Sequence, residues 1–149
     1  MKDGLLLLLA LLTLVGGYFL QQSGLLQPEP VKQQISADCD LQQQSCQVEL
    51  PDGSQLNLAI SPRPFRAVMP LDINLLFNGT RLPDELKIQF EGLNMDMGYN
   101  LVTLQKTSAN NFQAKAMLPA CTLDKMIWAF HLYVTVGETT TDVIFNVET

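Results

Sequence analysis

Residues 126–147 read MIWAFHLYVTVGETTTDVIFNV, and this stretch decides the fold class. A long run of β-branched and aromatic residues is followed by the turn-like segment GETT and then by a second apolar run, a pattern typical of paired β-strands. Because successive side chains of a strand point to opposite faces, one alternate set should face the core. That set is Met126, Trp128, Phe130 and Leu132. The opposite set is Ile127, Ala129, His131 and Tyr133, so we expect His131 to be exposed and not a metal ligand.

Short alternating segments of the same kind recur upstream, separated by turn signals. They read CQVEL, QLNLAI, LDINLLF, LKIQFEG, YNLVTLQK and FQAKAML. The first two flank PDGS, whose Asp52-Gly53 step favours a β-hairpin. No segment has the 3.6-residue apolar period of a capped amphipathic helix. About seven to eight strands therefore predict an all-β, immunoglobulin-like β-sandwich over residues 39–149, with a small barrel as the competing architecture.

The N-terminal segment differs in kind from this domain. Residues 4–20 read GLLLLLALLTLVGGYFL and carry no charge. At 1.5 Å per residue they form about 25 Å of helix, and extension to residue 26 supplies the length for a hydrocarbon core of about 30 Å. We therefore expect residues 1–26 to be a transmembrane anchor. A cleaved signal peptide is the alternative, although no A-x-A-like site follows the apolar core.

An anchor of this form predicts a single-pass protein of the inner (cytoplasmic) membrane with its C-terminal domain in the periplasm. Residues 27–38, QPEPVKQQISAD, contain two prolines and many polar side chains, which predicts an extended linker. This linker is either a spacer that lifts the domain off the lipid or a connector without a role of its own.

Composition excludes several classes of function. A net charge of −6 without a cluster of basic residues argues against nucleic-acid binding. A single histidine, the lack of a Gly-rich phosphate loop and the lack of a C-x-x-C motif argue against an enzyme. Thiol exchange at Cys121 is the one catalytic role that the residues leave open.

The three cysteines predict one disulfide and one free thiol in an extracytoplasmic domain. Their spacing does not match the C-x2-C pattern of zinc sites. Spacing alone does not assign the pair; we favour Cys39–Cys46 because a short loop joins them.

Strand parity predicts where the sulfur atoms lie. In an up-and-down succession of strands, alternate loops lie at the same end of a sandwich. Counting from the PDGS turn, the sulfur-bearing residues all fall at the opposite end, unless residues 61–70 contain a further strand crossing. These residues are Cys39, Cys46, Met69, Met95, Met97, Cys121 and Met126. We expect the linker to reach the domain at this same end, which would then face the membrane.

Two segments within that end carry candidate metal ligands. Met95-Asp96-Met97 puts two thioethers on one side of an extended segment, and Cys121 shortly precedes Met126 in PACTLDKM. Soft thioether and thiolate ligands select Cu(I), so Met95, Met97, Cys121 and Met126 are candidate Cu(I) ligands. Packing in the core is the competing interpretation, because methionine fills gaps and cysteine is commonly buried.

The run FEGLNMDMGYNLVTL (residues 90–104), followed by LPACTLDKMIW (residues 118–128), resembles small membrane-anchored periplasmic proteins of the FixH-like and YtkA-like kind. Met95, Met97, Gly98 and Trp128 match their pattern, whereas Cys121 and Met126 have no counterpart and the group's histidine-rich signatures are absent here. The resemblance implies a β-sandwich and a role in copper handling or in the assembly of haem–copper oxidases.

Two functional hypotheses follow. The first is a membrane-anchored periplasmic copper-binding or copper-delivery accessory protein that takes Cu(I) and acts on a membrane complex or with a copper chaperone. The second is an immunoglobulin-like interaction module without metal, an accessory subunit of a membrane complex.

Overall fold

Strands β9 (Ile127–Val136) and β10 (Thr139–Glu148) form the antiparallel hairpin that the alternating sequence predicts. Trp128, Phe130 and Leu132 of β9 are at most 1% exposed, and Met126, just before the strand, is 3% exposed. The Phe130 ring meets Phe90 edge to face, with ring centroids 4.6 Å apart. Fully burying a side chain of this size contributes about 1.5 to 3 kcal/mol. The predicted inner face of this strand is therefore confirmed.

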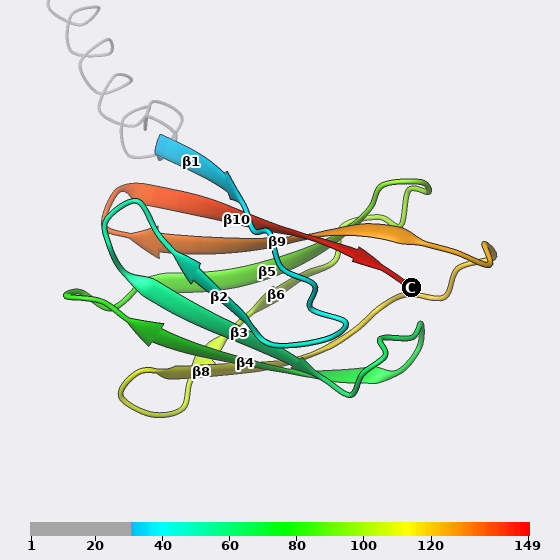
Figure 1. Cartoon of the computed structure of the whole chain (residues 1–149), viewed down its shortest axis with the longest axis horizontal. Helices are drawn as coiled ribbons and strands as arrows, with labels where there is room; N and C mark the ends of the chain where they lie inside the picture. Colours follow the sequence, from blue (N-terminus) through cyan, green and yellow to red (C-terminus); the bar gives the residue numbers. More distant parts are fainter. Residues whose placement is uncertain (1–30) are drawn as a thin grey trace, which may run out of the picture. The chain divides into compact units, whose positions relative to one another are not determined.

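The computed structural model describes residues 31–149, and this part of the chain is all-β. Two sheets of five strands face each other, in the orders β1-β10-β9-β5-β6 and β2-β3-β4-β8-β7 (Figure 1). The remaining strands are β1 (Val31–Ser36), β2 (Cys46–Glu49), β3 (Gln55–Ser61), β4 (Pro70–Asn78), β5 (Glu85–Gly92), β6 (Leu101–Thr103), β7 (Gln105–Lys106) and β8 (Asn111–Met117). Two separate sheets make a sandwich and not a closed barrel.

The chain changes sheets between β6 and β7, which the sequence suggested were one strand. Leu104, buried between them, donates its backbone N–H to Leu86 O at 2.9 Å, while β6 pairs with β5 and β7 pairs with β8. One apolar residue directed into the core thus marks the point where the chain crosses from one sheet to the other.

Strand β1 occupies half of the segment that the sequence predicted to be a linker. Residues 31–36, placed in the linker by sequence, pair with β10, and the compact unit begins at Val31. The pairing is parallel, with Val31 beside Thr139, so β1 starts at the end that carries the β9–β10 turn. The prediction that the chain reaches the domain at the sulfur-bearing end is therefore wrong, because it did not include this strand.

No helix in the described part of the chain is long and apolar enough to cross a membrane. The anchor expected over residues 1–26, and the first residues of the expected linker, lie outside the described residues.

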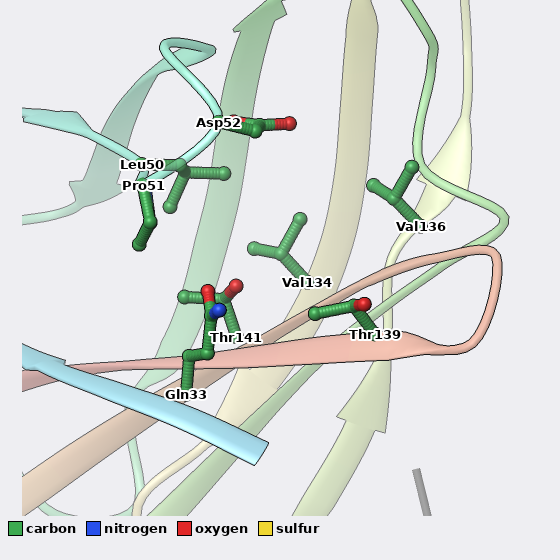
Figure 2. Close-up of a pocket in the computed structure, with 8 residues that line it drawn as sticks. All are labelled: Gln33, Leu50, Pro51, Asp52, Val134, Val136, Thr139 and Thr141. Atoms are coloured by element: carbon green, nitrogen blue, oxygen red, sulfur yellow. The ribbon is translucent and has the colours of Figure 1, made fainter. Parts of the chain in front are cut away.

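A pocket of about 310 Å³ opens between the sheets at the end where β1 begins (Figure 2). Its lining mixes apolar and polar side chains: Gln33, Leu50, Pro51, Asp52, Val134, Val136, Thr139 and Thr141. None of the candidate ligands lines this pocket, so it is separate from the sulfur-bearing end.

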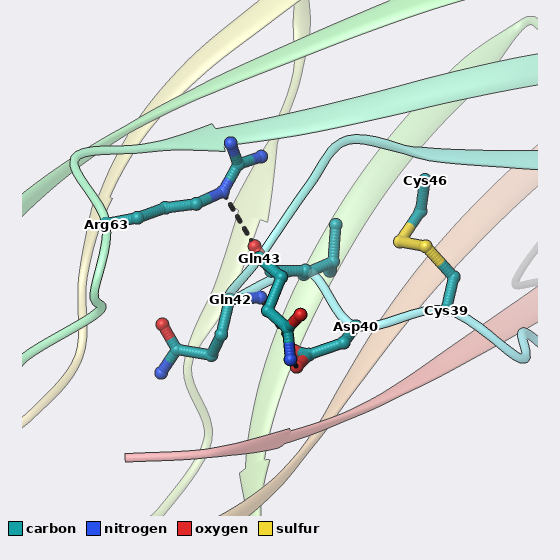
Figure 3. The surroundings of a disulfide bond; sticks show 7 residues. Cys39, Asp40, Gln42, Gln43, Cys46 and Arg63 are labelled. Atoms are coloured by element: carbon teal, nitrogen blue, oxygen red, sulfur yellow. Dashed lines mark hydrogen bonds between the residues drawn. A yellow bond between two sulfur atoms is a disulfide. The ribbon is translucent and has the colours of Figure 1, made fainter.

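A disulfide between Cys39 and Cys46 confirms the pairing that we favoured (Figure 3). The loop that it closes holds the neighbouring 62–69 loop through two hydrogen bonds. Arg63 Nε donates to Leu41 O at 2.7 Å, and Phe65 N donates to Gln42 Oε1 at 2.7 Å. The Phe65 ring in turn stacks on Phe130, with centroids 6.0 Å apart. The disulfide loop is therefore joined to the central core.

Reduction of the Cys39–Cys46 disulfide should lower the free energy of unfolding by about 2 to 3 kcal/mol, because opening a short closed loop restores chain entropy to the unfolded state. Urea unfolding with and without reductant, in a Cys121→Ser background, measures this loss. An unchanged transition midpoint would contradict it.

The turn between β9 and β10 is fixed from outside by Asp84. Gly137, in the left-handed region at φ 63°, donates its N–H to Asp84 Oδ2 at 2.6 Å, and Arg81 pairs with the same carboxylate at 3.1 Å. The Gly137 hydrogen bond, reinforced by the charge of Arg81, holds the pKa of Asp84 below its ordinary value of 3.8.

Because the folded state lowers the pKa of Asp84, this carboxylate stabilises the fold above pH 3.8 and loses that effect as the pH falls through the lowered value. Asp84→Asn should therefore be less stable than the unmodified chain at pH 7, and the difference should shrink in acid. Urea unfolding from pH 7 down to pH 2 tests this. Asp72→Asn, which removes only an exposed contact to Lys115, is the control.

Candidate metal centre

Three loops meet at the end of the sandwich opposite the β2–β3 turn. They are residues 62–69, 93–100 and 118–126, and none contains a strand that crosses the sandwich. Val68 N donates to Leu118 O at 2.8 Å, and Leu93 N donates to Ile127 O at 2.8 Å. The first bond joins the 62–69 loop to the 118–126 loop, and the second joins the 93–100 loop to the first residue of β9. The parity argument correctly predicted that these loops share one end.

Cys121 and Met95 lie in direct contact. The Cys121 Sγ is 3.5 Å from the Met95 Sδ, and both side chains are partly exposed. The Leu123 backbone N–H points at the same Cys121 sulfur from 3.2 Å. This hydrogen bond fixes the direction of the Cys121 side chain. Cys121 is not part of the disulfide.

Met97 and Met126 converge on Gly92, the last residue of β5. A Cβ built on Gly92 would lie 2.8 Å from Met97 Cγ and 3.1 Å from Met126 Cε, and it would also collide with the Met95 backbone oxygen. The missing side chain at residue 92 therefore lets the Met95 backbone and the side chains of Met97 and Met126 pack close to one point. The Met126 side chain is buried, whereas the Met97 side chain is partly exposed.

Hydrogen bonds from asparagine side chains fix the 93–100 loop. Asn94 Oδ1 accepts from Ile127 N at 3.0 Å, and Asn94 Nδ2 donates to Lys125 O at 3.0 Å. At the other end of the loop, Asn100 Nδ2 donates to Met97 O at 2.8 Å. Gly98 lies in the left-handed region at φ 70°, which a turn at this point of the loop requires. The positions of Met95 and Met97 are therefore set by the protein's own contacts.

The donor set suits a soft ion. Two sulfur ligands about 2.3 Å from one ion, at a tetrahedral angle, lie about 3.8 Å apart. The 3.5 Å separation of Cys121 Sγ and Met95 Sδ is close to this value. Among residues 31–149, His, Cys, Asp and Glu side chains form no group of three that could hold a metal ion. Any metal bound at this end would thus depend on thioethers.

The other sulfur residues have different surroundings. Cys39 and Cys46 are bonded to each other and are not free to bind a metal. Met69 lies partly buried in the 62–69 loop. Met117, which sequence reasoning passed over, ends β8 and is 50% exposed. Its place four residues before Cys121, at the end of a predicted strand, was the available signal.

His131 departs from its expected exposure. Its side chain is only 12% exposed and lies between two carboxylates on the outer face of the first sheet. The Nε2 atom is 3.0 Å from Glu91 Oε2, and Nδ1 is 3.1 Å from Asp142 Oδ2. In the imidazolium form both ring nitrogens donate, one to each carboxylate. The histidine is a cross-strand polar link, separate from the sulfur atoms.

Comparisons with protein-family models, with curated proteins and with solved structures gave no match for this chain. The interpretation of the sulfur-bearing end therefore depends on its own residues and geometry.

Gly92→Ala should displace the 93–97 segment, because the new methyl group would meet a backbone oxygen that cannot move independently of its loop. We expect a loss of stability of about 1 to 3 kcal/mol, with the largest amide shifts in the 93–100 loop. Urea unfolding and ¹H–¹⁵N correlation spectra measure both. Gly53→Ala is the matched control, because a Cβ there meets no atom and only the turn at φ 80° is strained.

Proposed function

We propose that this protein is a membrane-anchored periplasmic accessory protein that binds Cu(I) through Cys121, Met95 and Met97 and delivers it to a membrane complex or a copper chaperone. The observation that carries the proposal is the 3.5 Å contact between Cys121 Sγ and Met95 Sδ, with Met97 in the same short loop. Thiolate and thioether ligands together favour Cu(I) over hard cations.

The surroundings of this contact support a metal site over simple core packing. Met95, Met97 and Cys121 are partly exposed, so an ion could reach their sulfur atoms from solvent. Met126 is 3% exposed and its methyl group packs against Gly92. It therefore either forms the buried base of the metal site or becomes a fourth ligand after a change of rotamer.

The cellular setting belongs to the same proposal. The apolar residues 4–20 support a single transmembrane helix, and the disulfide supports an oxidising compartment such as the periplasm. The two facing sheets support an immunoglobulin-like sandwich. The Met-Asp-Met-Gly segment, which resembles FixH-like and YtkA-like proteins, supports a role in the assembly of a haem–copper oxidase.

Cu(I) affinity tests the proposal directly. The full-length protein in detergent, kept under anaerobic conditions, should compete with a chromogenic Cu(I) chelator at one ion per chain. Cys121→Ser and Met95→Leu should each weaken binding at least about tenfold, which corresponds to about 1.4 kcal/mol. Leucine keeps the volume of methionine, so the fold should be retained.

Met117→Leu is the matched control, because this exposed methionine is not part of the sulfur contact. Its Cu(I) affinity should equal that of the unmodified chain. Failure of the protein to compete with the chelator, or affinities that do not change in the Cys121 and Met95 variants, would refute the copper proposal.

A further inference from the structure

A second pocket lies on the outer face of the first sheet, and none of the candidate metal ligands lines it. Its volume is about 360 Å³, within the range of about 300 to 1,000 Å³ that is typical of ligand sites. We call it the tyrosine pocket, and its lining is Glu85, Lys87, Gln89, Tyr99, Leu101, Tyr133, Thr135 and Thr140. The strand residues that alternate with these, such as Ile88 and Leu132, are fully buried in the core, so the pocket faces outward.

Two tyrosines supply the aromatic part of the tyrosine pocket. Tyr99 is 76% exposed, the largest exposed fraction among the large hydrophobic side chains of residues 31–149. Its loop is nevertheless ordered, because the next residue, Asn100, donates its Nδ2–H to Met97 O at 2.8 Å. The Tyr133 ring stacks on His131, with centroids 6.0 Å apart. Aromatic rings fixed in this way combine an apolar face with a polar hydroxyl.

The polar side chains of the tyrosine pocket pair with one another and keep unused hydrogen-bonding capacity. Tyr133 donates its O–H to Gln89 Oε1 at 3.1 Å, which leaves the Gln89 NH₂ as a donor and the Tyr133 oxygen as an acceptor. The hydroxyls of Thr135 and Thr140 lie 3.0 Å apart, so one of their two hydrogens is not used in this contact. Burial, and after it the charge of Asp142, raises the pKa of Tyr133 above its ordinary value of 10.0, so its hydroxyl stays protonated at neutral pH.

The charged side chains of the tyrosine pocket neutralise each other. Lys87 Nζ lies 2.7 Å from Glu85 Oε2, and these are the two ionic residues of the lining. On the same face of the sheet, Glu91 and Asp142 flank His131 at 3.0 and 3.1 Å, so both carboxylates are already engaged. An anion would meet no unpaired cation in the lining, and a cation would meet no unpaired carboxylate there. The charges thus favour a neutral polar ligand.

We infer that the tyrosine pocket binds a neutral saccharide. Each sugar hydroxyl both donates and accepts, as the Gln89 amide and the Tyr133 oxygen together require. A sugar ring with equatorial hydroxyls also presents a flat face of C–H groups, which stacks on an exposed aromatic ring such as that of Tyr99. The inference goes beyond the copper proposal, because Cys121 and the methionines have no part in this pocket.

Titration of the ¹⁵N-labelled full-length protein with cellotriose and with chitotriose tests the inference. The detergent is a polyoxyethylene ether, because a detergent with a sugar headgroup would compete for the pocket. We expect saturable shifts, at millimolar ligand, of the Gln89 side-chain NH₂ and of backbone amides in residues 85–89 and 133–135. Mannitol carries hydroxyls but has no ring face, so it should cause no such shifts at the same concentration.

Four variants separate ring stacking from the fold and from copper. Tyr99→Ala should weaken saccharide binding at least about tenfold, whereas Tyr99→Phe keeps the ring and should change the affinity less than about twofold. Leu76→Ala, which alters an exposed leucine on the other sheet, is the surface control and should bind as the unmodified chain does. Cys121→Ser should also leave the affinity unchanged, so a failure of the copper proposal would not resemble a failure of this one.

Several results would overturn the inference. They are no saturable shift with either trisaccharide, equal shifts with mannitol, choline or inorganic phosphate, full affinity in Tyr99→Ala, and a loss in Tyr99→Phe as large as that in Tyr99→Ala.

Discussion

The reversal of chain direction from one strand to the next is the constraint on which this molecule depends. Each strand from β2 to β5, and then β8 to β10, reverses the direction of the one before it, so alternate loops return to the same end. Segments that lie far apart in the chain, such as Met95 and Cys121, are thereby brought into contact without any local sequence signal between them. Packing of the two sheets gives most strands one face toward the core and one toward solvent.

Much of this arrangement could be predicted from residues alone, because period-two alternation has a direct physical cause. It identified the inner face of β9 and, through parity, the shared end of the sulfur-bearing loops. Strand β1 could not be predicted in the same way. Its sequence, VKQQIS, is mostly polar, and it is held through backbone hydrogen bonds to β10 that no side-chain pattern reveals. Partial burial of His131 was missed for a related reason, since Glu91 and Asp142 come from other strands.

The candidate centre shows the same division between what sequence can predict and what it cannot. Residue types pointed to Met95, Met97, Cys121 and Met126, and strand parity placed them together. The conformation of the loops decides which sulfur atoms come into contact. This conformation is set by hydrogen bonds from Asn94 and Asn100 and by the absence of a side chain at Gly92. These positions carry no signal of their own in a single sequence, because asparagine and glycine are common in loops for many reasons.

The parallel alignment of β1 with β10 also has a mechanical consequence. A pull on the chain at Val31, opposed at the sulfur-bearing end, acts along the strand axis. The hydrogen bonds between β1 and β10 then bear the load together in shear and do not open one at a time. Beyond β1, the next covalent connection is the Cys39–Cys46 bond, which leads directly into β2 of the other sheet. Tension applied through β1 would thus reach both sheets.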